Sequence, residues 1–235
     1  MTWKPPEGMD EYLSATELCD CDNIEVKNRA QELTKDAATP KEAAMSIFNF
    51  VRDQILFGFN RYDAKASETL KGEIGFCITK STLQVALLRA AGIPARYHQV
   101  VLSNESLKGL VPDSIYRKKI PKKIGYHSCC ECYLAGKWVV CEALFDKALY
   151  NAACKKGIMS EEKIPNIDWD GDKDLIVVTP FMLEDKGNFP SLDGLFKKLQ
   201  DENKLPRIMA GIVFQYMNRH INKLRKGKNL VLKRI

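Results

Sequence analysis

Long apolar runs are missing from this chain of 235 residues. No stretch approaches the roughly 18 consecutive apolar residues of a membrane-spanning helix, so we expect no membrane span. The first residues, MTWKPPEGMDEYL, include proline, glycine and acidic residues where a secretory signal would have basic residues followed by an apolar segment. Together these absences predict a soluble, cytoplasmic protein.

The chain has few histidines, and it has fewer cysteines than a disulfide-rich protein. The chain has 8 cysteines, too few for a disulfide-stabilised secreted scaffold. In a reducing cytoplasm such cysteines are free thiols by default, and an exceptional one is a nucleophile or a metal ligand. The 3 histidines are His98, His127 and His220. A reaction that pairs a thiol with an imidazole therefore has few candidate partners.

The composition that is present, 45% hydrophobic and 28% charged, is that of a globular protein with one large core and room for an appendage. The net charge of +6 is uneven, because residues 217–235 contain Lys and Arg but no Asp or Glu. We interpret this tail as part of a solvated helix over 206–225 and expect no nucleic-acid partner. The buried stripe of that helix is predicted to be Phe214, Met217, Ile221 and Leu224. We predict a core of residues 1–150 and a C-terminal extension, 151–235, packed on it.

Hydrophobic periodicity predicts an α+β fold. Helices are expected over residues 24–35, 39–55 and 77–91, and strands over 95–102, 126–134, 137–144 and 174–178. The second helix has the strongest start signals, with Thr39 as N-cap, Pro40 in the first turn and Glu42 completing a capping box. Ala135-Gly136 predicts a tight hairpin between two of the strands.

Cys77 stands at the junction between a glycine-rich turn and an apolar helix. Gly72 and Gly75 permit close backbone approach, and the predicted helix begins at or beside the cysteine. A thiol attacks as its thiolate, and a helix N-terminus stabilises that anion through free N–H groups and the positive end of the dipole. The same N–H groups can hold a developing oxyanion. The competing interpretation is a small buried hydrophobic residue, the usual role of cysteine.

A nucleophilic cysteine needs a base, and His127 is the best placed histidine. It opens a predicted strand whose hairpin partner carries Glu142 among apolar residues. A buried carboxylate is costly unless it is paired, so Glu142 is a candidate to orient the imidazole, as the third member of Cys-His-acid sites does. Asp146 is the second candidate, and a solvent-facing Glu142 is the alternative. We expect His98 and His220 to be surface or hydrogen-bonded histidines without a catalytic role.

Three segments resemble the transglutaminase-like superfamily of papain-related cysteine enzymes, in a small prokaryotic-type form. They are Thr69-Leu70-Lys71-Gly72 leading to Gly75-Phe76-Cys77 and LLRAAGIPARY, then His127-Ser128-Cys129-Cys130-Glu131-Cys132-Tyr133, then Gly136-Lys137-Trp138-Val139-Val140-Cys141-Glu142. They follow the order and spacing of the family across residues 40–150. The resemblance implies a papain/transglutaminase-like core, in which a helix bearing the nucleophile packs on an antiparallel sheet that bears the other two residues.

The resemblance also implies acyl transfer on amide bonds, with Cys77 as nucleophile, His127 as general base and acid, and Glu142 as the orienting acid. The family usually has Asp at the position of Glu142, which leaves Asp146 open for that role. Hydrolysis of a peptide or protein amide, as in a protease or amidase, is preferred over transfer to an amine. The alternatives are a transglutaminase-type transferase and a non-catalytic binding scaffold. No cofactor and no calcium are expected, because the multi-domain architecture of the calcium-regulated members is absent.

The cysteines around His127 raise a zinc hypothesis. Cys129, Cys130 and Cys132 follow the histidine, and Cys141 lies in the next predicted strand. Strand alternation places His127 and Cys129 on one face and the other two cysteines of that strand on the opposite face. Because structural zinc needs four convergent ligands, we predict no metal site and interpret these thiols as packing residues of the sheet.

Two loops are expected to complete the site. Residues 59–68 are predicted to supply an oxyanion donor, with Asn60, Tyr62 and Asp63 as open alternatives. Residues 103–123 form a polar, Lys-rich excursion between two strands. Its length and position predict a lid over the cleft.

Overall fold

The computed structural model describes residues 5–196 and 207–227. The helices are α1 (Ile24–Thr34), α2 (Pro40–Asp53), α3 (Ala66–Gly72), α4 (Cys77–Ala90), α5 (Asp113–Lys119), α6 (Lys147–Lys155) and α8 (Arg207–Arg225), with 3-10 turns η1 (Asp10–Tyr12), η2 (Asn104–Leu107) and η3 (Thr179–Phe181). The strands are β1 (Leu56–Phe57), β2 (Ile74–Gly75), β3 (Ala95–Ser103), β4 (Lys123–Leu134), β5 (Lys137–Val140) and β6 (Met182–Phe189).

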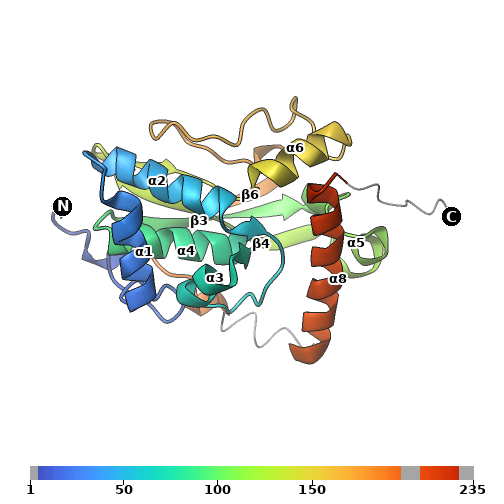
Figure 1. Ribbon diagram of the computed structural model, residues 1–235, viewed down its shortest axis with the longest axis horizontal. Helices are drawn as coiled ribbons and strands as arrows, with labels where there is room; N and C mark the ends of the chain where they lie inside the picture. Colours follow the sequence, from blue (N-terminus) through green and yellow to red (C-terminus); the bar gives the residue numbers. More distant parts are fainter. Residues whose placement is uncertain (1–4, 197–206, 228–235) are drawn as a thin grey trace.

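Four strands form the main sheet in the order β5-β4-β3-β6, and each neighbouring pair is antiparallel. A short parallel pair, β1 and β2, lies apart from it. Helix α4 packs against β3 and β4, with α1, α2 and α3 gathered around it, while α8 crosses the far end of the molecule (Figure 1). The predicted α+β fold, with the helix that carries Cys77 packed on an antiparallel sheet, is confirmed.

Helix α2 begins at Pro40 after the predicted N-cap Thr39, but Glu42 bonds the N–H one residue before the N–H that a capping box uses. The N–H of Glu42 donates to Thr39 Oγ1 at 3.2 Å, and the Glu42 carboxylate accepts from the Ala38 N–H at 2.8 Å. Its apolar stripe is buried, whereas α4 is buried along nearly its whole length and on all sides. A helix enclosed on all sides lies in the centre of a core, and α4 is therefore the central helix of this fold.

The hairpin predicted between β4 and β5 is confirmed. Ala135 and Gly136 have φ angles of 49° and 85°, and two successive positive φ angles define the turn that matches the twist of paired strands. Strand β5 ends at Val140, four residues earlier than predicted. Glu142 therefore lies just beyond the strand and not within it.

The strand prediction for residues 174–178 is wrong. This segment makes a single bridge, from Leu175 to Cys141. The fourth strand is β6, a mostly exposed, polar segment that pairs with the edge of β3. Backbone hydrogen bonds to β3 hold this strand in place, and they require no hydrophobic alternation in its sequence. The pattern search therefore missed it.

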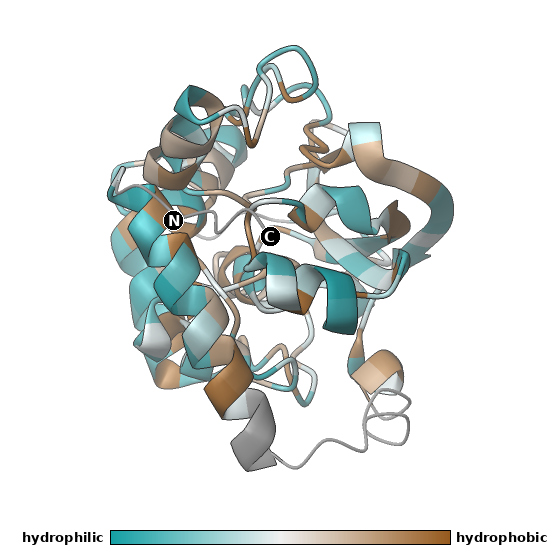
Figure 2. Ribbon diagram, turned by 90° about the vertical axis from the view of Figure 1, so that its right-hand side faces the viewer, coloured by the Kyte–Doolittle hydropathy of each residue, from teal (hydrophilic) through white to brown (hydrophobic). Residues whose placement is uncertain are grey.

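Helix α8 uses the buried stripe that its sequence predicts. Met217, Ile221 and Leu224 are buried, and Phe214 stacks on Phe59 with ring centroids 6.2 Å apart. Hydrophilic and hydrophobic residues alternate along the helices seen from this end of the molecule (Figure 2). No helix among the described residues has the length and apolarity needed to cross a bilayer. The division at residue 150 stays a prediction, and residues 228–235 of the basic tail lie outside the described residues.

Candidate functional site

Cys77 is the first residue of α4. Gly75 lies so close to the first turn of this helix that an added Cβ would stand 2.8 Å from Thr79 Oγ1 and 3.0 Å from Lys80 Cγ. The first bond of the helix runs from the Lys80 N–H to the Phe76 carbonyl at 2.8 Å. The N–H groups of Cys77 and of the two residues after it therefore precede the helical ladder. A thiolate at this position lies in the favourable field of the helix N-terminus.

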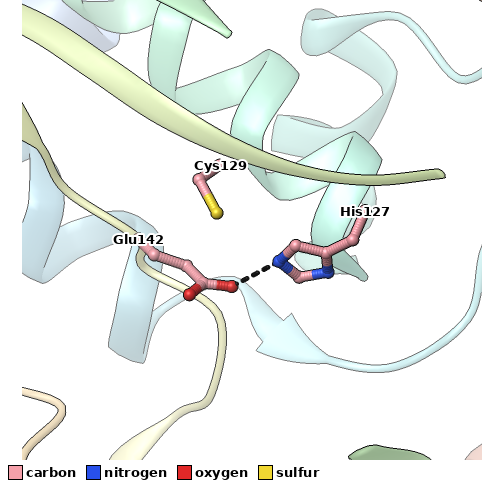
Figure 3. Close-up of side chains that lie close together, drawn as sticks. All are labelled: His127, Cys129 and Glu142. Atoms are coloured by element: carbon pink, nitrogen blue, oxygen red, sulfur yellow. Dashed lines mark hydrogen bonds and ion pairs between the residues drawn. The ribbon is translucent and has the colours of Figure 1, made fainter. Parts of the chain in front are cut away.

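His127 and Glu142 form a buried pair. His127 Nε2 lies 2.7 Å from Glu142 Oε1, and both side chains are only 3% exposed (Figure 3). The other carboxylate oxygen, Oε2, accepts a hydrogen bond from the Val178 N–H at 3.3 Å. The carboxylate thus fixes one ring nitrogen of His127, and the second ring nitrogen is left for a different partner.

Cys77 and His127 line the same cavity, which has a volume of about 130 Å³. Burial lowers the pKa of His127, but the adjacent Cys77 thiolate and Glu142 carboxylate outweigh it and raise the pKa well above its ordinary value. An imidazolium is therefore stabilised between two groups that can be anionic. The structure brings together the three residues that the sequence singled out.

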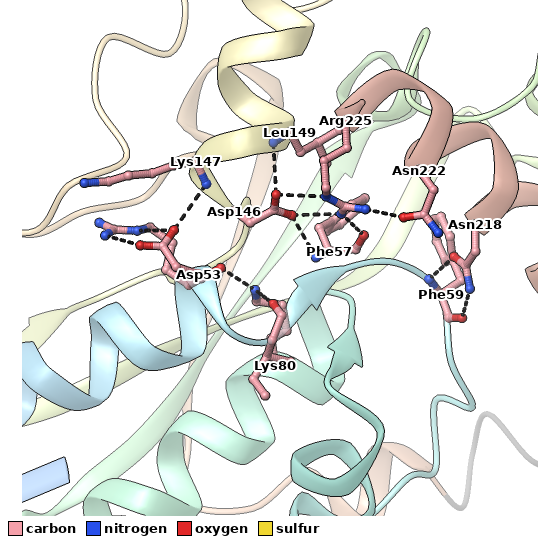
Figure 4. A network of polar contacts seen from close by, with 12 residues as sticks. Asp53, Phe57, Phe59, Lys80, Asp146, Lys147, Leu149, Asn218, Asn222 and Arg225 are labelled. Atoms are coloured by element: carbon pink, nitrogen blue, oxygen red, sulfur yellow. Dashed lines mark hydrogen bonds and ion pairs between the residues drawn. The ribbon is translucent and has the colours of Figure 1, made fainter. Parts of the chain in front are cut away.

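Asp146, the second carboxylate that the sequence left open, is held elsewhere. Its side chain accepts hydrogen bonds from Arg225 at 2.8 and 2.9 Å, from the Leu149 N–H at 2.9 Å and from the Phe57 N–H at 3.1 Å (Figure 4). Burial raises the pKa of Asp146, but the Arg225 guanidinium outweighs it and lowers the pKa. Asp146 therefore joins three parts of the chain, while Glu142 is the carboxylate in contact with His127.

Residues 174–178, which were predicted to form a strand, instead position Glu142. The Glu142 N–H donates to the Leu175 carbonyl at 3.0 Å, and the Leu175 N–H donates to the Val140 carbonyl at 2.9 Å. Asp174 accepts from the Val140 N–H at 2.8 Å. Together with the bond from the Val178 N–H, these contacts hold both the backbone and the side chain of Glu142.

Lys80 is a buried cation that the sequence analysis missed. It lies one turn after Cys77 on α4 and is 1% exposed. Its Nζ donates to the carbonyls of Ile55 and Arg52, the latter at 3.2 Å. Arg52 lies in the last turn of α2 and Ile55 lies two residues beyond that helix, so the amine fixes the end of α2 against the first turn of α4. An apolar helix face in the sequence gives no signal for such an inward-pointing lysine.

The stability of the fold should report this burial through its pH dependence. Burial lowers the pKa of Lys80 to about 7, against the opposing charges of Asp146 and Asp53. Above that pH the folded state holds fewer protons than the unfolded state, so stability rises with pH until the unfolded lysine titrates near pH 10. We expect the unfolding free energy of wild type, minus that of Lys80→Met, to increase from about pH 7 to pH 9 in urea titrations. A difference that stays flat over this range would contradict the prediction.

Two side chains of α8 hold the backbone beside the cavity. Asn218 accepts from the Phe59 N–H at 2.7 Å and donates to the Phe59 carbonyl at 2.8 Å, and Arg225 donates to the Phe57 carbonyl at 2.8 Å (Figure 4). More than 150 residues of sequence separate these partners. No local pattern could have paired them.

The oxyanion donors expected from residues 59–68 are not brought to the cavity. The Asn60 side chain donates to the Ile74 carbonyl at 3.1 Å and accepts from Thr79 Oγ1 at 2.8 Å. Neither Asn60 nor Tyr62 nor Asp63 lines the cavity of Cys77 and His127. The N–H groups of the first turn of α4, which begins at Cys77, stay candidates for that role.

The excursion over residues 103–123 folds into η2 and α5. Ser106 and Leu107 of η2 line the cavity, so this segment covers part of the site. The opening and closing of a lid stays a prediction.

One cluster of potential metal ligands surrounds His127. Ligand atoms of His127, Cys129 and Glu142 lie within 4.8 Å of one another, and the Cys129 sulfur points toward the space between the other two (Figure 3). Burial, with the adjacent Glu142 carboxylate, raises the pKa of Cys129 to about 12. Thiol, imidazole and carboxylate are all zinc ligands. A metal held there would compete for the same imidazole and carboxylate, and the absence of a bound metal stays a prediction.

The remaining cysteines and histidines have packing or hydrogen-bonding roles. Cys130, Cys132 and Cys141 are buried in the main core. His98 lies 3.1 Å from Glu131 and 3.1 Å from Asp185, and His220 Nε2 lies 3.2 Å from the Gly109 carbonyl. These contacts agree with the non-catalytic roles expected for the two histidines.

Comparison with known proteins places this chain in a family. The model of the transglutaminase-like superfamily matches residues 27–143, a span that contains Cys77, His127 and Glu142. No curated protein matches the chain. Among solved structures, a candidate cysteine protease from Cytophaga hutchinsonii is 20% identical over 60% of this chain and 43% of its own, with a TM-score of 0.45.

A candidate protease from Parabacteroides distasonis is 15% identical over 58% of this chain and 26% of its own, with a TM-score of 0.39. Red sea bream transglutaminase is 14% identical over 57% of this chain and 27% of its own, with a TM-score of 0.34. The chain thus spans less than half the length of each of these three structures. On the match of the family model, the chain belongs to the transglutaminase-like superfamily.

Proposed function

We propose that this protein is a cysteine-dependent acyl-transfer enzyme that acts on amide bonds of peptides or proteins. Cys77 is the nucleophile, His127 is the general base and acid, and Glu142 orients the imidazole. The observation that carries the proposal is one shared cavity. It joins a thiol at a helix N-terminus to an imidazole whose far nitrogen is fixed by a buried carboxylate.

The proposed reaction has two steps. The Cys77 sulfur bonds to the amide carbonyl carbon, the C–N bond breaks, and His127 gives its proton to the leaving amine. The N–H groups at the start of α4 stabilise the oxyanion formed in this step. Water then attacks the thioester while His127 accepts a proton, the C–S bond breaks and a carboxylic acid leaves.

We further propose that water, and not an amine, completes the reaction. Transfer to an amine would use the same first step. The alternative to an enzyme is a non-catalytic binding scaffold with the same fold. The buried, partnered His127 and Glu142 favour the enzyme, because burying both polar groups is costly for a scaffold that has no use for them. We also propose a cytoplasmic location, where the eight free cysteines remain thiols, and no nucleic-acid partner.

The proposal is tested by trapping the acyl-enzyme. Wild type and Cys77→Ala are incubated with a peptide library, quenched in acid, and weighed intact by mass spectrometry. We expect an acyl adduct on wild type that maps to Cys77 and is missing from the variant. Repeating the reaction with a primary amine in excess separates the two chemistries, since a hydrolase releases the acid and a transferase releases the amide of the added amine. No adduct from any peptide would favour the scaffold.

Thiol reactivity gives a second, substrate-free prediction. Cys77 is the first residue of α4 and shares its cavity with the His127 imidazolium, and both features activate a thiol toward alkylation. The raised pKa of His127, caused by Cys77 and Glu142 against the effect of burial, keeps that imidazolium charged. We expect iodoacetamide to label Cys77 at least about 10-fold faster than Cys154, measured by peptide mass spectrometry.

Cys154 is the control of similar exposure, because Cys77 and Cys154 are half-buried while the other six cysteines are buried. Burial raises the pKa of the Cys154 thiol, so both rates are also compared with that of free glutathione. Replacing the imidazole in His127→Asn should slow the labelling of Cys77 to the rate of Cys154. Equal rates for the two thiols in wild type would contradict the ion pair.

A further inference from the structure

The cavity beside Cys77 has an aromatic wall. Phe57, Phe59 and Phe76 line it, with ring centroids 5.9 Å apart for the first pair and 5.8 Å apart for the second. Aliphatic side chains from β3, η2 and β4 also line the cavity, including Leu102, Leu107 and Ile124. The thiol and the imidazole thus open onto a space whose remaining lining is dominated by carbon.

This wall is held in place and does not depend on a ligand to form it. Asn218 bonds to both the N–H and the carbonyl of Phe59, and Phe214 stacks on the Phe59 ring from α8. The backbone of Phe57 is held on one side by Asp146 and on the other by Arg225. Fixing both phenylalanines from their backbones keeps the cavity from collapsing, so a ligand meets a preformed space.

The size of the cavity limits what can enter. Its volume of about 130 Å³ is close to that of apolar cavities that stay dry and admit a benzene-sized group. A leucine or phenylalanine side chain fits this description. A carboxamide or an ammonium group would lose its hydrogen bonds to water on entering this cavity and would gain few in return.

We propose that this cavity is the binding site for the acyl side chain, so that the enzyme prefers amides whose attacked carbonyl carries a leucine- or phenylalanine-sized apolar group. The inference rests on the proposed function and narrows its substrate class. Substrates with a glutamine or lysine side chain next to the attacked carbonyl should therefore be disfavoured. Leu107 on η2 is a specificity-determining residue, because it is half-buried and lines the cavity.

The test uses peptidyl acyloxymethyl ketones that differ only in the side chain next to the ketone, which is glycine, leucine, phenylalanine, glutamine or lysine. The Cys77 sulfur bonds to the methylene carbon and displaces the carboxylate, and the rate of the mass increase gives the second-order rate constant. We expect the leucine and phenylalanine probes to react at least about 10-fold faster than the glutamine and lysine probes. Glutamine or lysine probes that react as fast would overturn the inference.

Leu107→Trp fills the cavity from its half-buried side, and Lys108→Ala is the matched control at an exposed neighbour. We expect Leu107→Trp to lower the rate of the phenylalanine probe relative to that of the glycine probe at least about 10-fold, while Lys108→Ala keeps the ratio of the two rates at its wild-type value. Equal slowing of every reagent would also overturn the inference. If neither the probes nor iodoacetamide react with wild-type Cys77, the proposed function itself fails, and that result differs from a reactive thiol without side-chain preference.

Discussion

Replacing Cys77 with alanine will lower kcat on any amide substrate by at least about 10⁴-fold, because removal of the nucleophile eliminates the acyl-enzyme route. Residual rate would come only from binding and from the N–H groups at the start of α4. The change removes one half-buried sulfur atom at the first position of a helix. We therefore expect the melting temperature to move by only a few degrees. Steady-state turnover and thermal unfolding of the same preparation check the two parts.

The matched control for this variant is Cys154→Ser. Cys154 is the other half-buried cysteine and lies in α6, so its loss should leave kcat unchanged. Substantial turnover by Cys77→Ala would remove the nucleophile from the mechanism. An equal loss of activity in Cys154→Ser would assign the effect to general damage of the fold.

Glu142→Gln will mainly lower kcat, whereas Asp146→Asn will mainly lower the stability of the fold. Glu142 contacts His127, so the amide variant should lower kcat by about 10²- to 10⁴-fold through loss of the charge that orients and stabilises the imidazolium. Its shape is preserved, and unfolding should change by no more than about 1–2 kcal/mol. Asp146→Asn breaks a buried ion pair with Arg225 and should cost about 3 kcal/mol of stability with a much smaller change in kcat.

The pH profile separates the two roles. Loss of the Glu142 charge should lower the pKa of His127, since that carboxylate is one of the charges that raise it, and the limb of the kcat/KM profile that reports the imidazolium should move to lower pH. Glu142→Asp keeps the charge and should retain more activity than Glu142→Gln. A large loss of kcat in folded Asp146→Asn, with Glu142→Gln near wild type, would reverse the assignment of the orienting acid.

Much of the scaffold was predictable from the sequence because its signals are local. Thr39, Pro40 and Glu42 mark the start of α2, and Ala135-Gly136 marks the hairpin through backbone conformations that few residues adopt. The start of α4 at Cys77 follows from a glycine-rich turn that runs into an apolar segment. His127 and Glu142 were found because they flank that hairpin, which brings distant chain positions together by a short-range rule.

Other features had no local signal. Strand β6 is polar and exposed, and it exists because β3 has a free edge for backbone pairing. The apolar segment 174–178 resembles a strand, yet its backbone instead holds Glu142. Hydrophobic periodicity indicates which residues are buried. It does not indicate which groups will form hydrogen bonds with the backbone of a buried segment.

By itself, the sequence determined the α+β class, the helix that begins at Cys77, and the candidate histidine and carboxylates, His127, Glu142 and Asp146. Only the tertiary structure showed that Glu142 contacts His127 whereas Asp146 contacts Arg225, because these partners are distant along the chain. It alone also built the aromatic cavity, by fixing Phe57 and Phe59 from a helix more than 150 residues away. Capping and turn signals depend on a few neighbouring residues, whereas the site consists of contacts between distant residues that form only when the chain folds.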